Sequence, residues 1–215
     1  MKEPKHHFPD EVLLEYVAGN TVEAVSLAIA VHGSLCEPCR WQIALLERMG
    51  GALVDAAEPA PLRGDALERA LAKLDDAPVP KPAPLSAPPG LEYLPRPLWR
   101  YLARDRAAFS AVVPGIATIE LGIAPRAGTA RIVQLDPDVV IPQHDHGGPE
   151  YGVLLRGGLR DGEADLHRGD VFYRTPGDVH EQSVLPGEPC IALVINEGSL
   201  IPLTEAGELL KLFSA

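Results

Sequence analysis

The stretch that decides the fold of the second half is residues 143–157, Q-H-D-H-G-G-P-E-Y-G-V-L-L-R-G. It contains two histidines two positions apart, a Gly-Pro turn, a glutamate and an apolar run that ends at glycine. Alternate side chains of a strand point to the same face, so we expect His144 and His146 to point together into the mouth of a barrel. Glu150 then lies where the next strand begins.

Short apolar runs bounded by Gly, Pro and Asp turns lie on both sides of this stretch. The expected strands are 116–123, 129–135, 151–155, 171–173 and 190–195. Such spacing is typical of a sandwich or a small jelly-roll barrel. A short amphipathic helix is expected at 204–213.

A further histidine, His180, ends the stretch 168–180, R-G-D-V-F-Y-R-T-P-G-D-V-H. With the first three residues it gives three imidazoles and one carboxylate, a set that suits Zn, Mn, Fe or Ni. The only acid–base groups expected beside these ligands are Tyr151, Tyr173 and Glu181, and no residue is assigned a catalytic role. A barrel without metal, with solvated rim histidines, is the alternative interpretation.

The first half contains a second candidate metal site, in residues 31–40, V-H-G-S-L-C-E-P-C-R. The ligands are His32, Cys36 and Cys39. Two thiolates and one imidazole leave a tetrahedral zinc one ligand short, and His6 or His7 can supply the fourth. A redox dithiol is the alternative, but such motifs usually accompany a βαβ pattern, which this half lacks.

Helical periodicity extends over 12–17, 22–36, 41–53 and 67–74. Trp41 and Trp99 are expected to be packing anchors. Four short helices bury little surface, and domains of this size often need a structural metal. Eight prolines between 78 and 97 predict an extended linker. We therefore expect an α+β chain of two domains, with the helical bundle at 1–77, the linker at 78–97 and the barrel at 98–215.

The charge balance limits the classes of partner. The 215 residues include 19 Lys and Arg against 30 Asp and Glu, a net charge of −11. This acidity argues against direct nucleic-acid binding and suits a basic protein partner. No apolar run approaches the ~20 residues of a membrane span, and three cysteines fit a reducing compartment, so we expect a cytoplasmic protein. The third cysteine, Cys190, is expected to be a buried small hydrophobe, and a role as an oxidant-sensing thiol near the barrel metal is the alternative.

Residues 6–19, H-H-F-P-D-E-V-L-L-E-Y-V-A-G, followed by H-x3-C-x2-C, resemble the zinc-binding domain of bacterial anti-sigma factors of the ChrR type. The resemblance covers residues 6–76. It implies a zinc held by His7, His32, Cys36 and Cys39. It also implies a helical bundle that binds an extracytoplasmic-function sigma factor and keeps it from core RNA polymerase.

The second half resembles the cupin family in its two motifs, 144–157 and 169–180. The resemblance implies a barrel metal held by His144, His146, Glu150 and His180. This sequence departs from the motifs at Asp138, where glycine is preferred, at Pro176, which is displaced by one place, and at Val184, which replaces asparagine.

Together the two halves predict a regulator. The helical half would bind the sigma factor, and the cupin half would sense a stress signal and cause its release. The ChrR resemblance suggests an oxidative signal such as singlet oxygen or organic hydroperoxides. The alternative function is a metal-dependent cupin oxygenase or isomerase with an accessory helical domain.

Overall fold

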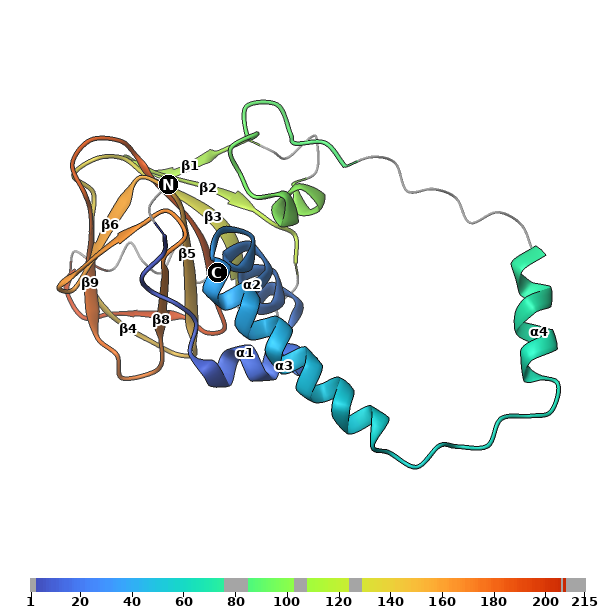
Figure 1. The fold of residues 1–215 in the computed structure, drawn as a ribbon. Coiled ribbons are helices and arrows are strands. Elements are labelled where there is room, and N and C mark those ends of the chain that lie inside the picture. The colour runs from blue at the N-terminus through green and yellow to red at the C-terminus, as the bar shows by residue number, and fades with distance from the viewer. Residues whose placement is uncertain (1–2, 76–84, 103–107, 124–128, 206, 208–215) are drawn as a thin grey trace.

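The computed structural model describes residues 3–75, 85–102, 108–123, 129–205 and 207, with helices first and strands after them (Figure 1). The helices are α1 (Asp10–Val17), α2 (Glu23–Leu35), α3 (Glu37–Asp55) and α4 (Ala66–Ala72), with 3₁₀ turns η1 (Lys73–Asp75) and η2 (Arg96–Tyr101). The strands are β1 (Ser110–Val113), β2 (Ile116–Glu120), β3 (Thr129–Leu135), β4 (Val140–His146), β5 (Glu150–Arg156), β6 (Gly158–Asp161), β7 (Ala164–His167), β8 (Val171–Arg174), β9 (His180–Val184), β10 (Cys190–Asn196) and β11 (Leu200–Pro202). The predicted α+β class is confirmed.

The strands form two antiparallel sheets that face each other. One sheet has the order β1-β2-β3-β10-β5-β8 and the other β11-β4-β9-β6-β7. This is the two-sheet arrangement expected of a jelly roll. The apolar runs of β3, β5, β8 and β10 were predicted from the sequence, and all of them lie in the first sheet.

The first sheet is apolar on both faces because the helices cover its outer face. Side chains such as Val153 and Leu193 lie in one core with the helices, whereas Leu154 and Ala192 lie in a second core inside the sandwich. Two-sided burial explains why these strands read as continuous apolar runs. The strands of the second sheet alternate buried and exposed residues, and β4 and β9 carry the polar ligands. The sequence therefore indicated only the end of β4, at His144 and His146.

Helix α2 joins the two parts of the molecule. It packs on α1, α3 and η2 and also on β5 and β10 (Figure 1). Residues along its whole length are buried, including Ala24, Ile29 and His32. Only the face that carries Glu23 and Ser34 is exposed, so other elements cover most of the helix surface. The helical part is therefore continuous with the barrel through a shared core.

The chain between the two parts packs against the core through its leucines. Leu91, Leu94 and Leu98 are buried in the core shared by helices and barrel, and η2 begins at Arg96. Trp99 donates a hydrogen bond from Nε1 to the Leu94 carbonyl (2.9 Å), consistent with a packing role. Residues 78–84 of the predicted linker lie outside the described residues. So does most of the helix expected at 204–213.

Helix α3 differs from the expected pattern. Trp41 was predicted to anchor packing but is 63% exposed. Leu45, Met49 and Leu53 follow it at intervals of four residues and are exposed as well. The reason is that α3 contacts the bundle through its other face, where Cys39 is buried and Ile43 packs against the core. Within the described residues, no helix has both the length and the apolarity of a membrane span.

Candidate metal centres

The first cluster lies where α2 ends and α3 begins. Cys36 is extended (φ −116°, ψ 113°) between the two helices, and its N–H still donates to the His32 carbonyl (2.8 Å). This sharp junction, followed by Pro38 in the first turn of α3, places the H-x3-C-x2-C side chains on one side. The ligand atoms of His7, His32, Cys36 and Cys39 all lie within 4.8 Å of one another.

The structure brings His7 rather than His6 into this cluster. His7 Nδ1 lies 3.4 Å from the Sγ atoms of both Cys36 and Cys39. Ligands about 2.0 and 2.3 Å from one tetrahedral zinc are about 3.5 Å apart, so the spacing fits this ion. The backbone of His6 instead pairs with β8, because Val171 N–H donates to its carbonyl (3.1 Å).

The buried His32 ring is the clearest indication that this cluster suits a metal. Its Nδ1 donates to the Gly169 carbonyl (2.7 Å), and its Nε2 is buried with no hydrogen-bond partner among the described residues. Burial lowers the pKa of His32 to about 4, so the ring is neutral and Nε2 offers a lone pair. Burial, with Cys36 beside it, raises the pKa of Cys39 to about 12. A bound cation stabilises the thiolate form of such a thiol.

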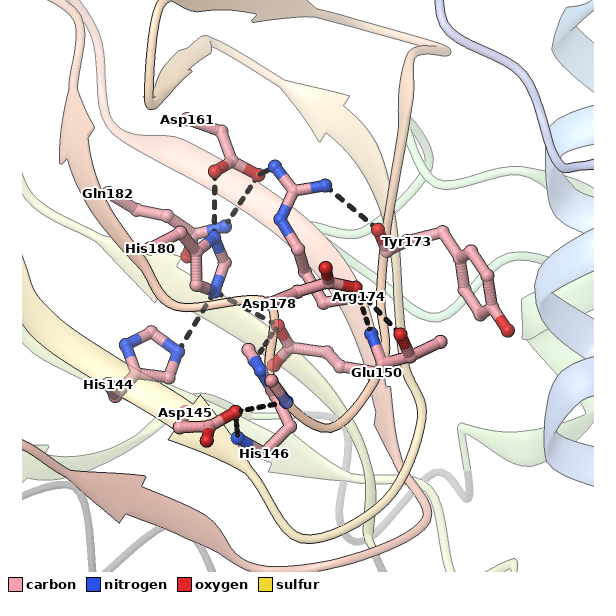
Figure 2. Close-up of polar contacts among 12 residues, drawn as sticks. His144, Asp145, His146, Glu150, Asp161, Tyr173, Arg174, Asp178, His180 and Gln182 are labelled. Carbon is pink, nitrogen blue, oxygen red and sulfur yellow. Dashed lines mark hydrogen bonds and ion pairs between the residues drawn. The ribbon is translucent and has the colours of Figure 1, made fainter.

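The second cluster lies inside the barrel and draws on three strands. Figure 2 shows the imidazoles of His144 and His146 from β4 and of His180 from β9 converging on Glu150 of β5. All four side chains are buried. His146 Nε2 lies 3.2 Å from Glu150 Oε2, and His180 Nε2 lies 3.7 Å from the same oxygen.

The tautomers of two imidazoles follow from their partners. His144 Nδ1 donates to the Pro142 carbonyl (2.9 Å), and His180 Nδ1 donates to Asp161 Oδ1 (2.7 Å). In neutral rings the two Nε2 lone pairs therefore face each other across 3.1 Å. Burial lowers the pKa of His144, which favours its neutral ring. A shared cation relieves this repulsion, so the donor set fits a divalent metal with N and O ligands.

Sequence reasoning missed the residues that orient His180. Asp161 is buried, and its Oδ1 accepts a hydrogen bond from His180 Nδ1. Its Oδ2 accepts one from Gln182 Nε2 (3.4 Å) and pairs with Arg174 at 2.8 Å (Figure 2). Such outer partners are typical of metal-binding imidazoles. In the sequence, Asp161 precedes Gly162, a pair that indicates only a turn. Gln182 alone carried a signal, because it lies two residues from His180 on the same strand face.

The three acid–base groups expected beside the barrel ligands do not reach them. Tyr151 and Tyr173 belong to the core that the helices share, with their rings 5.1 Å apart, and Glu181 is exposed. Figure 2 shows the Tyr173 ring directed away from the cluster. Strand alternation explains this, because each tyrosine neighbours a residue that does point inward.

A cavity of about 60 Å³ adjoins the barrel cluster. His144 and Glu150 form part of its wall, and apolar side chains such as Phe172 and Leu200 form much of the rest. The ring of Phe172 fits there because Gly152 has no side chain, since a Cβ on it would lie 2.0 Å from the ring. Cys190 also lines this cavity. It is fully buried as expected, and burial raises the pKa of its thiol to about 12.

Comparison with known proteins shows which proteins this chain is related to. The family model for the ChrR cupin-like domain matches residues 100–200. The chain is 29% identical over 207 residues to the anti-sigma-E factor ChrR of Cereibacter sphaeroides, an alignment that covers 91% of each chain. This chain is a ChrR homologue. The relationship to ChrR that the sequence motifs predicted is confirmed.

The homology to ChrR extends to three-dimensional structure. The crystal structure of Rhodobacter sphaeroides SigE in complex with the anti-sigma ChrR matches with a TM-score of 0.75 and 28% identity, covering 89% of this chain and 98% of that chain. This ChrR homologue therefore shares both the helical part and the barrel with ChrR. One departure from the cupin motif has a local explanation, because Asp138 has φ 66°, a conformation that glycine adopts without strain.

Proposed function

We propose that this chain is an anti-sigma factor that sequesters an extracytoplasmic-function sigma factor and releases it on a stress signal sensed by the barrel. The homologous ChrR is described in complex with SigE. The observation of this chain that carries the proposal is a pair of exposed apolar stripes on the helical part. An exposed apolar patch on a globular protein marks an interaction surface.

The first stripe runs along α3. Its residues are Trp41, Leu45, Met49 and Leu53, all at least 38% exposed. Intervals of four residues place them on one face of the helix. Tryptophan and methionine are enriched at protein interfaces, and tryptophan is a frequent source of binding energy. We expect this α3 stripe to contact the sigma factor.

The second stripe lies on α4, which stands apart from the barrel and the other helices (Figure 1). Leu67 and Leu71 of α4 and Leu74 of the following turn η1 are each more than half exposed, and no residue of α4 is buried. A short isolated helix is marginal in water. We therefore expect α4 to become stable when its leucines pack against the partner.

Charge favours a sigma factor as the occupant of both stripes. Residues 1–77 contain 7 basic and 13 acidic residues, which gives 7 − 13 = −6. Sigma factors bind DNA, and DNA-binding surfaces are rich in Lys and Arg. Opposite charge steers such partners together, whereas the same acidity disfavours direct contact with nucleic acid.

We also propose one metal at each cluster. A structural zinc would be held by His7, His32, Cys36 and Cys39, and it would stabilise the α2–α3 junction on which the α3 stripe depends. Zinc or another divalent metal (Mn, Fe or Ni) would be held in the barrel by His144, His146, Glu150 and His180. The adjoining cavity would admit a small molecule that acts as the stress signal. The ChrR relationship makes an oxidative signal the first to test.

The other assignments follow from this function. We propose 1–77 as the sigma-binding unit, 98–215 as the sensing unit and 78–97 as their connection, in a cytoplasmic protein without direct membrane contact. Oxygenase or isomerase activity is the competing function of the barrel. The structure supports this activity less well. Tyr151 and Tyr173 pack in the core shared with the helices, and Glu181 is exposed, so none of the three acid–base groups faces the cavity.

Co-purification with metal analysis tests the proposal. The full chain is coexpressed with the extracytoplasmic-function sigma factors of its source organism, one at a time. We expect a stoichiometric complex with one of them and about two metal equivalents per chain, one for each cluster. Absence of a complex with every sigma factor, together with turnover of a diketone or thiol by the iron-loaded chain, would favour the enzyme instead.

Glu150→Ala separates sensing from binding. Loss of the one carboxylate ligand is expected to reduce metal affinity of the barrel at least about tenfold, while the helical part keeps its own metal. The variant should bind the sigma factor as wild type does but fail to release it under oxidative stress, as measured by a sigma-dependent reporter. Glu181→Ala, which removes an exposed carboxylate beside His180, is the matched control and should respond normally. Loss of sigma binding in Glu150→Ala would contradict the division of roles.

A further inference from the structure

The turn between β7 and β8 of the barrel contacts the first metal cluster. This β7–β8 turn (residues 167–171) is held by the barrel itself, because Gly169 N–H donates to the Leu154 carbonyl (2.7 Å) and Leu154 N–H donates to the Asp170 carbonyl (2.9 Å). Both bonds connect the turn to β5, whose first residue is Glu150. The turn is thus a fixed part of the sheet.

Gly169 of this turn orients one ligand of the cluster. Its carbonyl accepts the Nδ1 hydrogen of His32 at 2.7 Å, which leaves Nε2 free to face the cysteines. A hydrogen bond of this kind fixes the tautomer and the ring orientation of a metal-binding histidine. The acceptor lies 137 residues away in the chain, within the barrel.

Asp170 holds the segment that carries another ligand. Its side chain is 3% exposed, and Oδ1 accepts hydrogen bonds from the backbone N–H groups of Lys5 (2.6 Å) and His6 (3.0 Å). Oδ2 accepts from His167 N–H (2.8 Å), which fixes the carboxylate within its own turn. Hydrogen bonds to a buried carboxylate are strong. They position the residue directly before His7.

Packing at Gly169 adds to these bonds. Gly169 has φ 95°, and a Cβ there would lie 2.6 Å from Cγ of Pro4. The N-terminal segment (residues 4–8) therefore lies directly on the turn, with Val171 N–H donating to the His6 carbonyl. The turn therefore holds this region by its Gly169 carbonyl, by its Asp170 carboxylate and by packing against Pro4. Together these contacts place His7 and His32 relative to the barrel.

We propose that the β7–β8 turn of the barrel is the outer shell of the N-terminal metal site, with Asp170 as its positioning residue. This inference rests on the zinc site proposed above. The helical part supplies all four ligands, and the barrel supplies the groups that orient two of them. Displacement of the turn would loosen the metal without any change of ligand, which gives the barrel a direct means of acting on the sigma-binding part.

Cobalt exchange in the full chain tests this inference. Co²⁺ bound to thiolates gives a charge-transfer absorption that reports the Cys-containing cluster and not the barrel cluster. The cobalt-loaded protein is mixed with excess chelator, and the decay of this absorption gives the rate of metal loss. In Asp170→Ala we expect a rate at least about tenfold above wild type, because outer-shell changes weaken metal sites by about 10–100-fold.

A second variant leaves the barrel untouched. Lys5→Pro deletes the backbone N–H that donates to Asp170, whereas Lys5→Ala keeps it and serves as the matched control. We expect faster cobalt loss in Lys5→Pro and the wild-type rate in Lys5→Ala. Asp165→Ala is a control within the barrel. Asp165 lies on β7 and forms an exposed ion pair with Arg160, so this variant should also lose cobalt at the wild-type rate.

The outcomes separate this inference from the proposed function. Wild-type rates in both Asp170→Ala and Lys5→Pro would overturn the positioning role, even if the chain binds metal and sigma factor normally. Absence of the thiolate-to-cobalt absorption in the wild-type chain would instead overturn the metal site itself.

Discussion

Replacing Cys39 by serine is expected to remove the metal from the helical part and to abolish sigma-factor binding. The change deletes one of the two thiols of the cluster and leaves Cys36, His7 and His32 as an incomplete ligand set. Metal binding at such sites is coupled to folding, so the α2–α3 junction and the exposed stripe of α3 should lose their fixed positions. Loss of a structural metal is among the few single changes that cost more than about 4 kcal/mol.

Thermal unfolding and metal analysis measure this effect. About 4 kcal/mol corresponds to a fall of roughly 8–16 °C in Tm for a chain of this size. Metal content should fall from about two equivalents to about one, since the barrel cluster is intact. His6→Ala is the matched control, because His6 lies beside His7 but outside the cluster. A Cys39→Ser protein that keeps its metal and binds the sigma factor would contradict the assignment.

Aspartate in the exposed stripes is expected to weaken sigma-factor binding without weakening the fold. Trp41 is 63% exposed and Leu71 is 54% exposed, so Trp41→Asp and Leu71→Asp should change the free energy of unfolding by less than about 0.5 kcal/mol. At the centre of an interface each change should cost about 2–4 kcal/mol of binding, a rise in Kd of about 30-fold or more.

Calorimetry of the purified complex measures this difference. Leu203→Asp is the matched control, since Leu203 is 50% exposed and lies on the barrel, where its N–H donates to the Gln143 carbonyl of β4. We expect its Kd to equal that of wild type. If Trp41→Asp and Leu71→Asp bind as wild type does while Leu203→Asp does not, the sigma factor contacts the barrel and the assignment of the stripes is wrong.

The sequence predicted the apolar parts of the fold well. Thr129–Leu135 is a strand with the predicted bounds, and the run from Cys190 is a strand extended by one residue to Asn196. Both lie in the sheet that is buried on both faces, where the apolar signal is continuous. The strands β4 and β9 were harder to predict, because His144 and His180 occupy inward positions that apolar residues take elsewhere.

The sequence also indicated both ligand clusters but not what surrounds them. Spacing brought Cys36 and Cys39 together because both lie at one helix junction. It did not indicate that Gly169 would contact His32, since this contact depends on how the helices dock on the barrel. The exposure of Trp41 was missed for a related reason. An apolar stripe indicates burial, and the sequence alone does not say whether the chain or a partner covers it.

Competition with core RNA polymerase tests the central claim most directly. The purified, zinc-loaded chain is titrated into a mixture of the cognate sigma factor and core enzyme, and holoenzyme formation is measured by initiation of transcription. We predict inhibition that is complete near one chain per sigma factor and absent with Cys39→Ser. Transcription that is unaffected by an excess of the metal-loaded chain would contradict its function as an anti-sigma factor.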